Sequence, residues 1–261
     1  MPHYLRFARE EAEGFGIAND AGDTIAIHTG DMFADARPTG RSLPLAEARL
    51  LPPTVPSKIV ALWNNSRSAA ERQKIDPPNT PLYFIKTPNT HLAPGAAIRK
   101  PASYDGRVIF EAELGIVIGK TCRGVSEEAA ADYVFGYTCV NDVTALQIIR
   151  EDASFAQWSR AKNFDTFTPM GPSIATDLAP DALAGLAIRA ELNGRERQNY
   201  LVSDLFFPPL RLVSLISRDM TLEPGDVISC GTGPGALPMK PGDRIEIIID
   251  RIGRLTNDYT E

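Results

Sequence analysis

The sequence predicts an α+β protein that is mainly β, with short helices. Runs of β-branched and aromatic residues with a period of two recur along all 261 residues, and the helical segments between them are short. Three prolines within residues 52–56 make a stiff, extended connection that divides the chain. We therefore expect a small β-rich N-terminal region, 1–55, and a larger domain, 56–261.

Composition limits the classes of function. A hydrophobic content of 43% and a charged content of 23% are typical of a soluble globular protein. The net charge of -6, without a basic cluster, argues against nucleic acid or an anionic membrane as a partner. No run approaches the roughly 18 apolar residues of a membrane span. The three cysteines are scattered, so we expect free thiols and a cytoplasmic location.

The first elements are short strands, expected at residues 4–9, 15–18, 23–27, 58–63 and 82–86. Between the last two, Ser68 and Glu71 have the spacing of a capping box, which starts a helix. The prolines at 77 and 78 end that helix after a few turns.

An acidic strand is expected at residues 108–118, followed by Gly119 and Lys120. Its period of two places Glu111 and Glu113 on one face, with backbone positions roughly 7 Å apart. The segment that follows is apolar on both faces, which is typical of a strand covered on both sides. Two like charges in a covered site require a compensating cation. The two residues therefore indicate either a metal site or a solvated acidic face.

Asp142 follows the next buried strand, expected at residues 134–140, and a helix after Ser126 separates the two strands. A carboxylate at a strand end can turn inward as a ligand. A helical stretch is expected at 143–151, so Asp142 alone is more simply an N-cap residue.

The segment 158–167 mixes aromatic and charged residues, a pattern that suits the wall of a cleft. Lys162 in this segment is either simply exposed or functional. If it lies near the acids and the metal, its ammonium would hold a substrate carboxylate or stabilise an enolate. His91, alone in a loop, is a weaker candidate for a base.

The C-terminal third is expected to be β-rich. A strand at 186–192 turns at Asn193-Gly194 into a hairpin, and the prolines at 208 and 209 open a helix through residue 217. Two Pro-Gly-Asp turns introduce strands at 227–230 and 244–249. The glycine-rich loop 231–235 lies between these strands and lets the backbone approach a ligand closely.

Taken together, these motifs resemble the fumarylacetoacetate hydrolase superfamily from about residue 56 to the end. The motifs that carry the resemblance are Glu-x-Glu on a strand, Gly136-Tyr137-Thr138, Asn141-Asp142-Val143-Thr144-Ala145, Lys162, 164–167, Gly171-Pro172 and Gly231-Thr232. The resemblance implies a mixed β-roll or β-sandwich core with short helices and a homodimer.

The resemblance also implies the roles of individual residues. Glu111, Glu113 and Asp142 match the family's metal ligands, normally for Mg2+ or Mn2+, and their oxygen donors also suit Ca2+. Lys162 matches the active-site lysine, and we expect Thr232, Gly231 and Lys86 to bind substrate.

Three positions depart from the family pattern. Hydrolytic members carry a histidine and a glutamate that activate water, whereas this chain has Ser68 with Glu71. Leu146 and Ile149 stand where an arginine and a glutamine are usual, and Pro234 is displaced by one residue from the usual Gly-Thr-Pro.

We therefore expect a divalent-metal-dependent enzyme that acts on a 2-oxo or 2-hydroxydienoic acid through a metal-stabilised enolate. Decarboxylase and isomerase members from the degradation of aromatic compounds are the nearest chemical models. The alternative is C–C hydrolysis of an acylpyruvate, with His91 or a metal-bound hydroxide as the base. A third alternative is a catalytically silent, metal-binding homologue.

Overall fold

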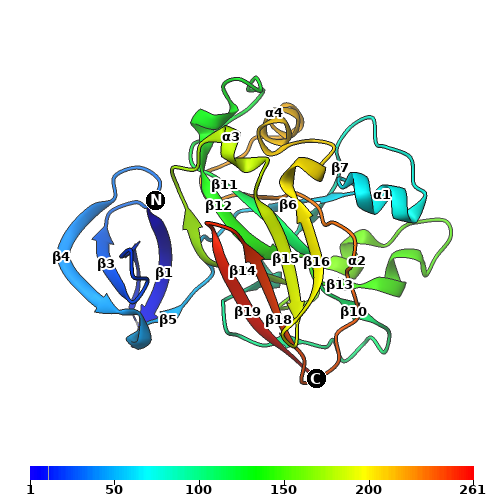
Figure 1. The fold of residues 1–261 in the computed structure, drawn as a ribbon, viewed down its shortest axis with the longest axis horizontal. Helices are drawn as coiled ribbons and strands as arrows, with labels where there is room; N and C mark the ends of the chain where they lie inside the picture. The colour runs from blue at the N-terminus through cyan, green and yellow to red at the C-terminus, as the bar shows by residue number, and fades with distance from the viewer. Residues whose placement is uncertain (11) are drawn as a thin grey trace.

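The computed structural model describes residues 1–10 and 12–261, and its secondary structure is mainly β, as predicted. Figure 1 shows the strands, joined by short helices. The strands of the first half are β1 (His3–Arg9), β2 (Ala12–Ala18), β3 (Thr24–Thr29), β4 (Arg37–Pro44), β5 (Arg49–Leu50), β6 (Ile59–Trp63), β7 (Leu82–Lys86), β8 (His91–Leu92), β9 (Ile98–Arg99), β10 (Val108–Ile109) and β11 (Ala112–Ile118). Those of the second half are β12 (Val134–Asn141), β13 (Thr144–Ala145), β14 (Thr168–Ala175), β15 (Ala187–Leu192), β16 (Arg195–Leu201), β17 (Val227–Ser229), β18 (Arg244–Ile249) and β19 (Gly253–Thr260).

The helices are short. The α-helices are α1 (Arg67–Gln73), α2 (Trp158–Lys162), α3 (Pro180–Leu183) and α4 (Pro209–Asp219). The 3-10 helices are η1 (Leu45–Glu47), η2 (Pro88–Thr90), η3 (Ala130–Tyr133), η4 (Leu146–Arg150) and η5 (Val202–Asp204). In the described part of the chain, no helix is long and apolar enough to span a membrane.

Strands β1 to β4 form an antiparallel meander that stands to one side of the molecule (Figure 1). This meander has its own small core of Leu5, Phe7, Ile25 and Leu43. Strand β1 also pairs with β14, so the meander continues the main sheet. The sheet runs in the order β4-β3-β2-β1-β14-β12-β11-β17-β6-β7.

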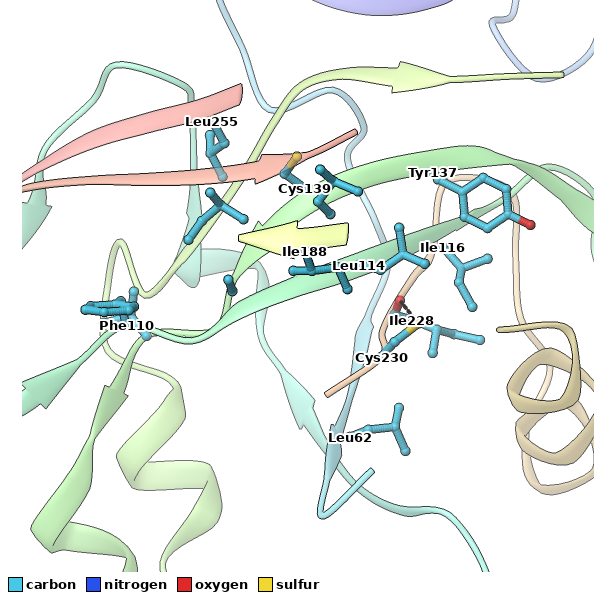
Figure 2. Packing of buried hydrophobic residues seen from close by; sticks show 14 of the residues in the cluster. Leu62, Phe110, Leu114, Ile116, Tyr137, Cys139, Ile188, Ile228, Cys230 and Leu255 are labelled. Carbon is cyan, nitrogen blue, oxygen red and sulfur yellow. Dashed lines mark hydrogen bonds between the residues drawn. The ribbon is translucent and has the colours of Figure 1, made fainter. Parts of the chain in front are cut away.

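A second sheet, in the order β16-β15-β18-β19-β9, packs against the main sheet. Figure 2 shows the apolar side chains between them: Leu114 from β11 and Cys139 from β12 lie near Ile188 from β15 and Leu255 from β19. Burial of these side chains removes apolar surface from water, at roughly 25 cal/mol per Å². The two layers thereby fix β11, which carries Glu113 and begins directly after Glu111, and β12, which ends directly before Asp142.

Strand β11 lies at the centre of the main sheet between β12 and β17, and all seven of its residues are buried. The prediction of a strand covered on both faces is therefore confirmed. The single strand expected over 108–118 is interrupted, because β10 pairs with β13 while β11 pairs with β12. The chain changes partner at Phe110 and Glu111, and Glu111 lies at this break.

The expected capping box at Ser68 and Glu71 is wrong. Ser66 is the N-cap of α1, and its hydroxyl accepts a hydrogen bond from the amide of Ala69 at 3.1 Å. An N-cap bond of this kind contributes about 1 kcal/mol. The hydroxyl of Ser68 instead donates to Asp204, a residue 136 positions away.

Two other expected helices are shorter than predicted. After Ser126 the chain forms only the 3-10 helix η3, and the stretch expected over 143–151 forms β13 and then η4. Thr144 and Ala145, which were expected in the first helical turn, pair with β10 as strand β13 instead. By contrast, the hairpin β15–β16 at Asn193-Gly194, the helix from the prolines at 208 and 209, and the free cysteines are confirmed.

Candidate active site

Three carboxylates meet at the edge where β11 and β12 adjoin β10 and β13. Glu111 and Glu113 lie two residues apart, and Asp142 follows β12 directly. One oxygen from each of the three lies within 4.8 Å of the others. The amide of Asp142 donates to the carbonyl oxygen of Glu111 at 2.9 Å, which fixes the two segments side by side.

Glu113 is buried and held by two donors, one from the end of β17 and one from the loop that follows it. The Ser229 hydroxyl donates to Oε2 at 2.6 Å, and the amide of Gly231 donates to the same atom at 2.8 Å. Gly231 has a φ of +90°, a conformation that favours glycine. Sequence reasoning assigned Gly231 to substrate binding, but its amide is occupied by Glu113.

Asp142 and Glu111 share a buried lysine. Lys162 donates to Oδ2 of Asp142 at 2.5 Å and also to Oε2 of Glu111. Glu111 accepts a further hydrogen bond from the Thr144 hydroxyl at 2.8 Å. On its other oxygen, Asp142 accepts a hydrogen bond from Lys86.

The pKa values of the cluster diverge. Burial, with repulsion by Asp142 and Glu111, raises the pKa of Glu113 to about 8. Burial also raises the pKa of Glu111 against the attraction of Lys162. Burial opposes ionisation of Asp142, but the two lysines outweigh it, so the pKa of Asp142 is lowered. Burial likewise opposes the charge of Lys162, yet the carboxylates raise its pKa.

The cluster fits a divalent cation. Three carboxylates that converge on one point repel each other, and the raised pKa of Glu113 is a consequence of that repulsion and of burial. A cation among them would replace the missing positive charge. The donors are oxygen atoms alone, which suit Mg2+, Mn2+ or Ca2+ rather than zinc.

Lys86, which was expected to bind substrate, is paired with protein groups in the structure. Its side chain is fully buried, and its ammonium donates to Asp142 and to the carbonyl oxygen of Phe167 at 2.8 Å. Burial lowers the pKa of Lys86 despite the attraction of Asp142. Lys86 therefore positions Asp142 from behind the site.

A cavity of about 1060 Å³ opens onto the carboxylates. Glu111, Glu113 and Lys162 line it, so the prediction that the segment around Lys162 forms a cleft wall is confirmed. Part of the wall is aromatic: Phe84 and Trp158 stack with ring centroids 5.5 Å apart, and Lys162 lies 5.0 Å from the centroid of Phe84.

Thr232 lines the cavity as expected, and its hydroxyl is already paired. This hydroxyl donates to the carbonyl oxygen of Ala112 at 3.1 Å and accepts from Gln198 at 2.9 Å. Tyr200 donates to the same carbonyl oxygen at 2.7 Å, so β16 ties the glycine-rich loop to β11. A substrate bond from the Thr232 hydroxyl requires the Ala112 bond to break.

Ser68, Glu71 and His91 do not line the cavity in the part of the chain that the structure describes. Ser68 is bound to Asp204, Glu71 is exposed on α1, and His91 lies on β8. Burial, with the nearby charge of Lys86, lowers the pKa of His91 to about 4. Leu146 and Ile149, the two departures from the family pattern, do line the cavity.

Sequence reasoning missed several residues that shape the site. Gln198 and Tyr200 are buried on β16, and the largely polar sequence of that strand gave no signal of their burial. Thr144 and Ser229 hold the two glutamates. Arg72, Arg107 and Arg150 line the cavity from separate segments, and no pattern in the sequence connects them.

The comparisons with known proteins agree with this fold and site. The family model "Fumarylacetoacetate (FAA) hydrolase C-terminal" matches residues 58–260, and "Rv2993c-like, N-terminal" matches residues 3–53. The chain therefore belongs to the fumarylacetoacetate hydrolase C-terminal family.

Three relatives are named for different activities. The oxaloacetate tautomerase YisK of Bacillus subtilis is 36% identical over 82% of this chain and 73% of its own. The structure of 5-carboxymethyl-2-hydroxymuconate delta-isomerase from Mycobacterium smegmatis superimposes with a TM-score of 0.90, 38% identity and 99% coverage of both chains. Maleylpyruvate hydrolase from Sphingobium sp. SYK-6, solved with manganese(II) and pyruvate, superimposes with a TM-score of 0.79, 30% identity and coverage of 98% of this chain and 99% of that one.

Proposed function

We propose that this protein is a divalent-metal-dependent enzyme that tautomerises, isomerises or decarboxylates a 2-oxo or 2-hydroxydienoic acid in the breakdown of aromatic compounds. The observation that carries the proposal is the position of Lys162, which lines the cavity beside Glu111 and Glu113. The names of the tautomerase and the isomerase among the relatives support this class of reaction.

The cation would be held by Glu111, Glu113 and Asp142. Bound there, Mg2+ or Mn2+ would act as a Lewis acid on the 2-oxo acid and so favour loss of a proton or of CO2 at the adjacent carbon. The related maleylpyruvate hydrolase, whose structure contains manganese(II), supports a divalent metal in this protein.

Lys162 would stabilise negative charge on the substrate. Its pKa is raised by the surrounding carboxylates, so at neutral pH it is a cation and a hydrogen-bond donor, not a base. A fixed ammonium directed into a cavity stabilises an oxyanion more than the same group does in water. The aromatic wall beside it limits access of water and strengthens this effect.

Hydrolysis is less well supported, because it requires a group that deprotonates water. The side-chain candidates for that role, Ser68 with Glu71 and His91, lie outside the described cavity wall, so hydrolysis would depend on water activated by the metal alone. Leu146 and Ile149, which stand in place of polar residues of the family pattern, add apolar surface to the same wall.

An ultraviolet assay tests the proposal. Protein stripped of metal with a chelator is offered oxaloacetate, acetylpyruvate and a 2-hydroxydienedioate, with and without Mg2+ or Mn2+. Glu113→Gln and Lys162→Met should abolish the activity, and Glu196→Gln, an exposed carboxylate of β16, should not.

Metal-dependent decay of an enol band, or release of CO2, is the expected result. Cleavage of acetylpyruvate to pyruvate and acetate would overturn the proposal in favour of a hydrolase. Absence of metal-dependent turnover with all three substrates would instead indicate a silent homologue.

A further inference from the structure

Three aromatic side chains form one continuous surface in the wall of the cavity that opens onto the carboxylates. Trp63 ends β6, Phe84 lies in the middle of β7, and Trp158 begins α2. The rings of Phe84 and Trp158 stack with an angle of 12° between their planes, and the centroid of Trp63 lies 5.5 Å from that of Trp158. Because each ring comes from a different element, the surface is a product of the tertiary structure.

The aromatic surface begins beside the group that we assign to charge stabilisation. The Lys162 ammonium donates to Glu111 and lies 5.0 Å from the ring centroid of Phe84. From Phe84 the surface continues to Trp158 and then to Trp63, with each centroid 5.5 Å from the one before. A ligand tail that extends from the carboxylates along this side of the cavity therefore crosses aromatic surface.

The rings of this surface are only partly covered by the protein. Trp63 and Trp158 are half-buried, Phe84 is 9% exposed, and all three line the cavity. Two aliphatic side chains, Leu146 and Ile149, are also half-buried and line it. A ligand that covers these groups removes their remaining apolar surface from water, which favours binding.

The size and the charges of the cavity suit a bulky, uncharged tail. Its volume of about 1060 Å³ is at the upper end of the roughly 300–1,000 Å³ of pockets for drug-sized ligands, so a pyruvate-sized acid would leave most of it unfilled. Arg72, Arg107 and Arg150 also line the cavity, but all three are exposed, so their charges remain hydrated. Away from the carboxylates, the less exposed part of the wall is mainly apolar.

We propose that Trp63, Phe84 and Trp158 bind an aryl group on the tail of the substrate, so that the site prefers 2-oxo acids that carry an aromatic ring. Stacked or edge-on contact between aromatic rings is more favourable than burial of the same apolar area alone. The inference rests on the proposed function, because it takes the carboxylate cluster as the position of the 2-oxo acid end.

Tryptophan fluorescence measures such binding directly, because both tryptophans of the chain line this cavity. Fluorescence is titrated with 2-oxo-4-phenylbutanoate, 4-cyclohexyl-2-oxobutanoate and 2-oxobutanoate, each in the presence of Mg2+. The phenyl and cyclohexyl ligands have the same length and nearly the same size. Comparison of the two therefore separates aromatic stacking from burial of apolar area.

Four variants locate the binding of the ring. Trp158→Leu removes the central ring of the surface, and Trp158→Phe keeps a ring there. Trp63→Leu removes the outermost ring and tests the surface independently if replacement of Trp158 prevents folding. The control is Phe155→Leu, because Phe155 is 69% exposed, precedes α2 by three residues and lies outside the described cavity wall. Each leucine variant of a tryptophan keeps the other tryptophan as the reporter.

The wild-type protein should bind the phenyl ligand at least roughly tenfold more tightly than 2-oxobutanoate, as burial of a ring implies. It should also prefer the phenyl ligand to the cyclohexyl ligand by roughly threefold or more, as contact between rings implies. Trp158→Leu should lose this second preference and Trp63→Leu should reduce it, whereas Trp158→Phe and Phe155→Leu should keep it. Equal affinities of the wild type for phenyl and cyclohexyl ligands, or an unchanged preference in both leucine variants of the tryptophans, would overturn the aryl assignment.

Repetition of the titrations without metal separates failure of this inference from failure of the proposed function. If all three ligands bind only with Mg2+ and with equal affinity, the 2-oxo acid end is where the proposed function places it and the aryl assignment alone fails. If the phenyl ligand binds equally well with and without Mg2+, or not at all, the proposed function fails and the aryl assignment fails with it.

Discussion

Lys162 and Asp142 form a buried ion pair, with Nζ and Oδ2 2.5 Å apart, and Lys86 holds the other oxygen of the same carboxylate. One carboxylate is thus enclosed by two ammonium groups inside the protein. Lys162 is also paired with Glu111, so it links two of the three carboxylates of the cluster into one network. Stability and function therefore depend on the same charges.

Removal of the Asp142 charge should destabilise the protein strongly. Asp142→Asn keeps the shape of the side chain but leaves two buried ammonium groups without their shared carboxylate. Breaking a buried pair in this way costs roughly 3–5 kcal/mol in the free energy of unfolding. Urea denaturation of the metal-free protein measures it.

The matched control is Asp258→Asn, which breaks the exposed pair with Arg244. Exposed pairs are screened by solvent, so the midpoint of unfolding should hardly change. If Asp142→Asn and Asp258→Asn lowered the free energy of unfolding equally, burial of the Asp142 network would not contribute to stability.

Binding of a divalent cation should release a proton near neutral pH. The pKa of Glu113 is about 8, so below that pH its carboxyl is mostly protonated and must ionise to bind the metal. Calorimetry in buffers of different ionisation enthalpy should show proton release at pH 7 that falls away at pH 9. Glu113→Gln should lower metal affinity and remove that release, and a wild-type affinity independent of pH would refute the role of Glu113.

The same shift determines how stability of the metal-free protein varies with pH. Between the ordinary carboxyl value of 4.5 and about 8, the folded state binds more protons at Glu113 than the unfolded state does. The contribution of Glu113 to stability therefore falls as pH rises through this window. Unfolding curves at pH 5, 6.5 and 8.5 give the free energy of unfolding of the wild type and of Glu113→Gln. As the pH rises, this free energy should fall more for the wild type than for Glu113→Gln.

His91 should make the protein less stable in mild acid. Its pKa is lowered to about 4, so between pH 4 and 6.5 the unfolded state binds more protons and stability rises with pH. His91→Gln should flatten this dependence. Thermal unfolding of the wild type and of His91→Gln across that range measures the difference.

The glycine-rich loop should tolerate alanine poorly at Gly235. Gly235 has a φ of +109°, and a Cβ there would overlap the carbonyl oxygen of Arg197. Gly242→Ala is the control, because Gly242 has a similar φ of +93° but no atom within 4 Å of an added Cβ. Gly235→Ala should lower the melting temperature more than Gly242→Ala and also raise KM, since Gly235 lines the cavity. An equal fall in melting temperature for both variants would show that backbone strain alone matters.

Much of the fold could be predicted because it depends on local patterns. The period of two located the strands around Glu113, the Asn193-Gly194 turn located a hairpin, and the prolines at 208 and 209 located the start of α4. The helix start at Ser66 was missed, because Ser68 and Glu71 satisfied the same spacing rule. Asp204, far along the chain, accepts hydrogen bonds from the hydroxyls of both serines, while the amide of Ala69 donates to Ser66 alone.

The sequence by itself predicted that Glu111 and Glu113 point to one side, since side-chain direction alternates along a strand. The structure keeps the two carboxylates together although Glu111 lies at the break before β11. Motif resemblance added Asp142 and Lys162. Only the tertiary structure decided that Lys86 lies behind Asp142, that Gly231 holds Glu113 with its amide, and that three distant arginines line one cavity. These arrangements follow from the pairing and packing of strands far apart in the chain, which no local pattern encodes.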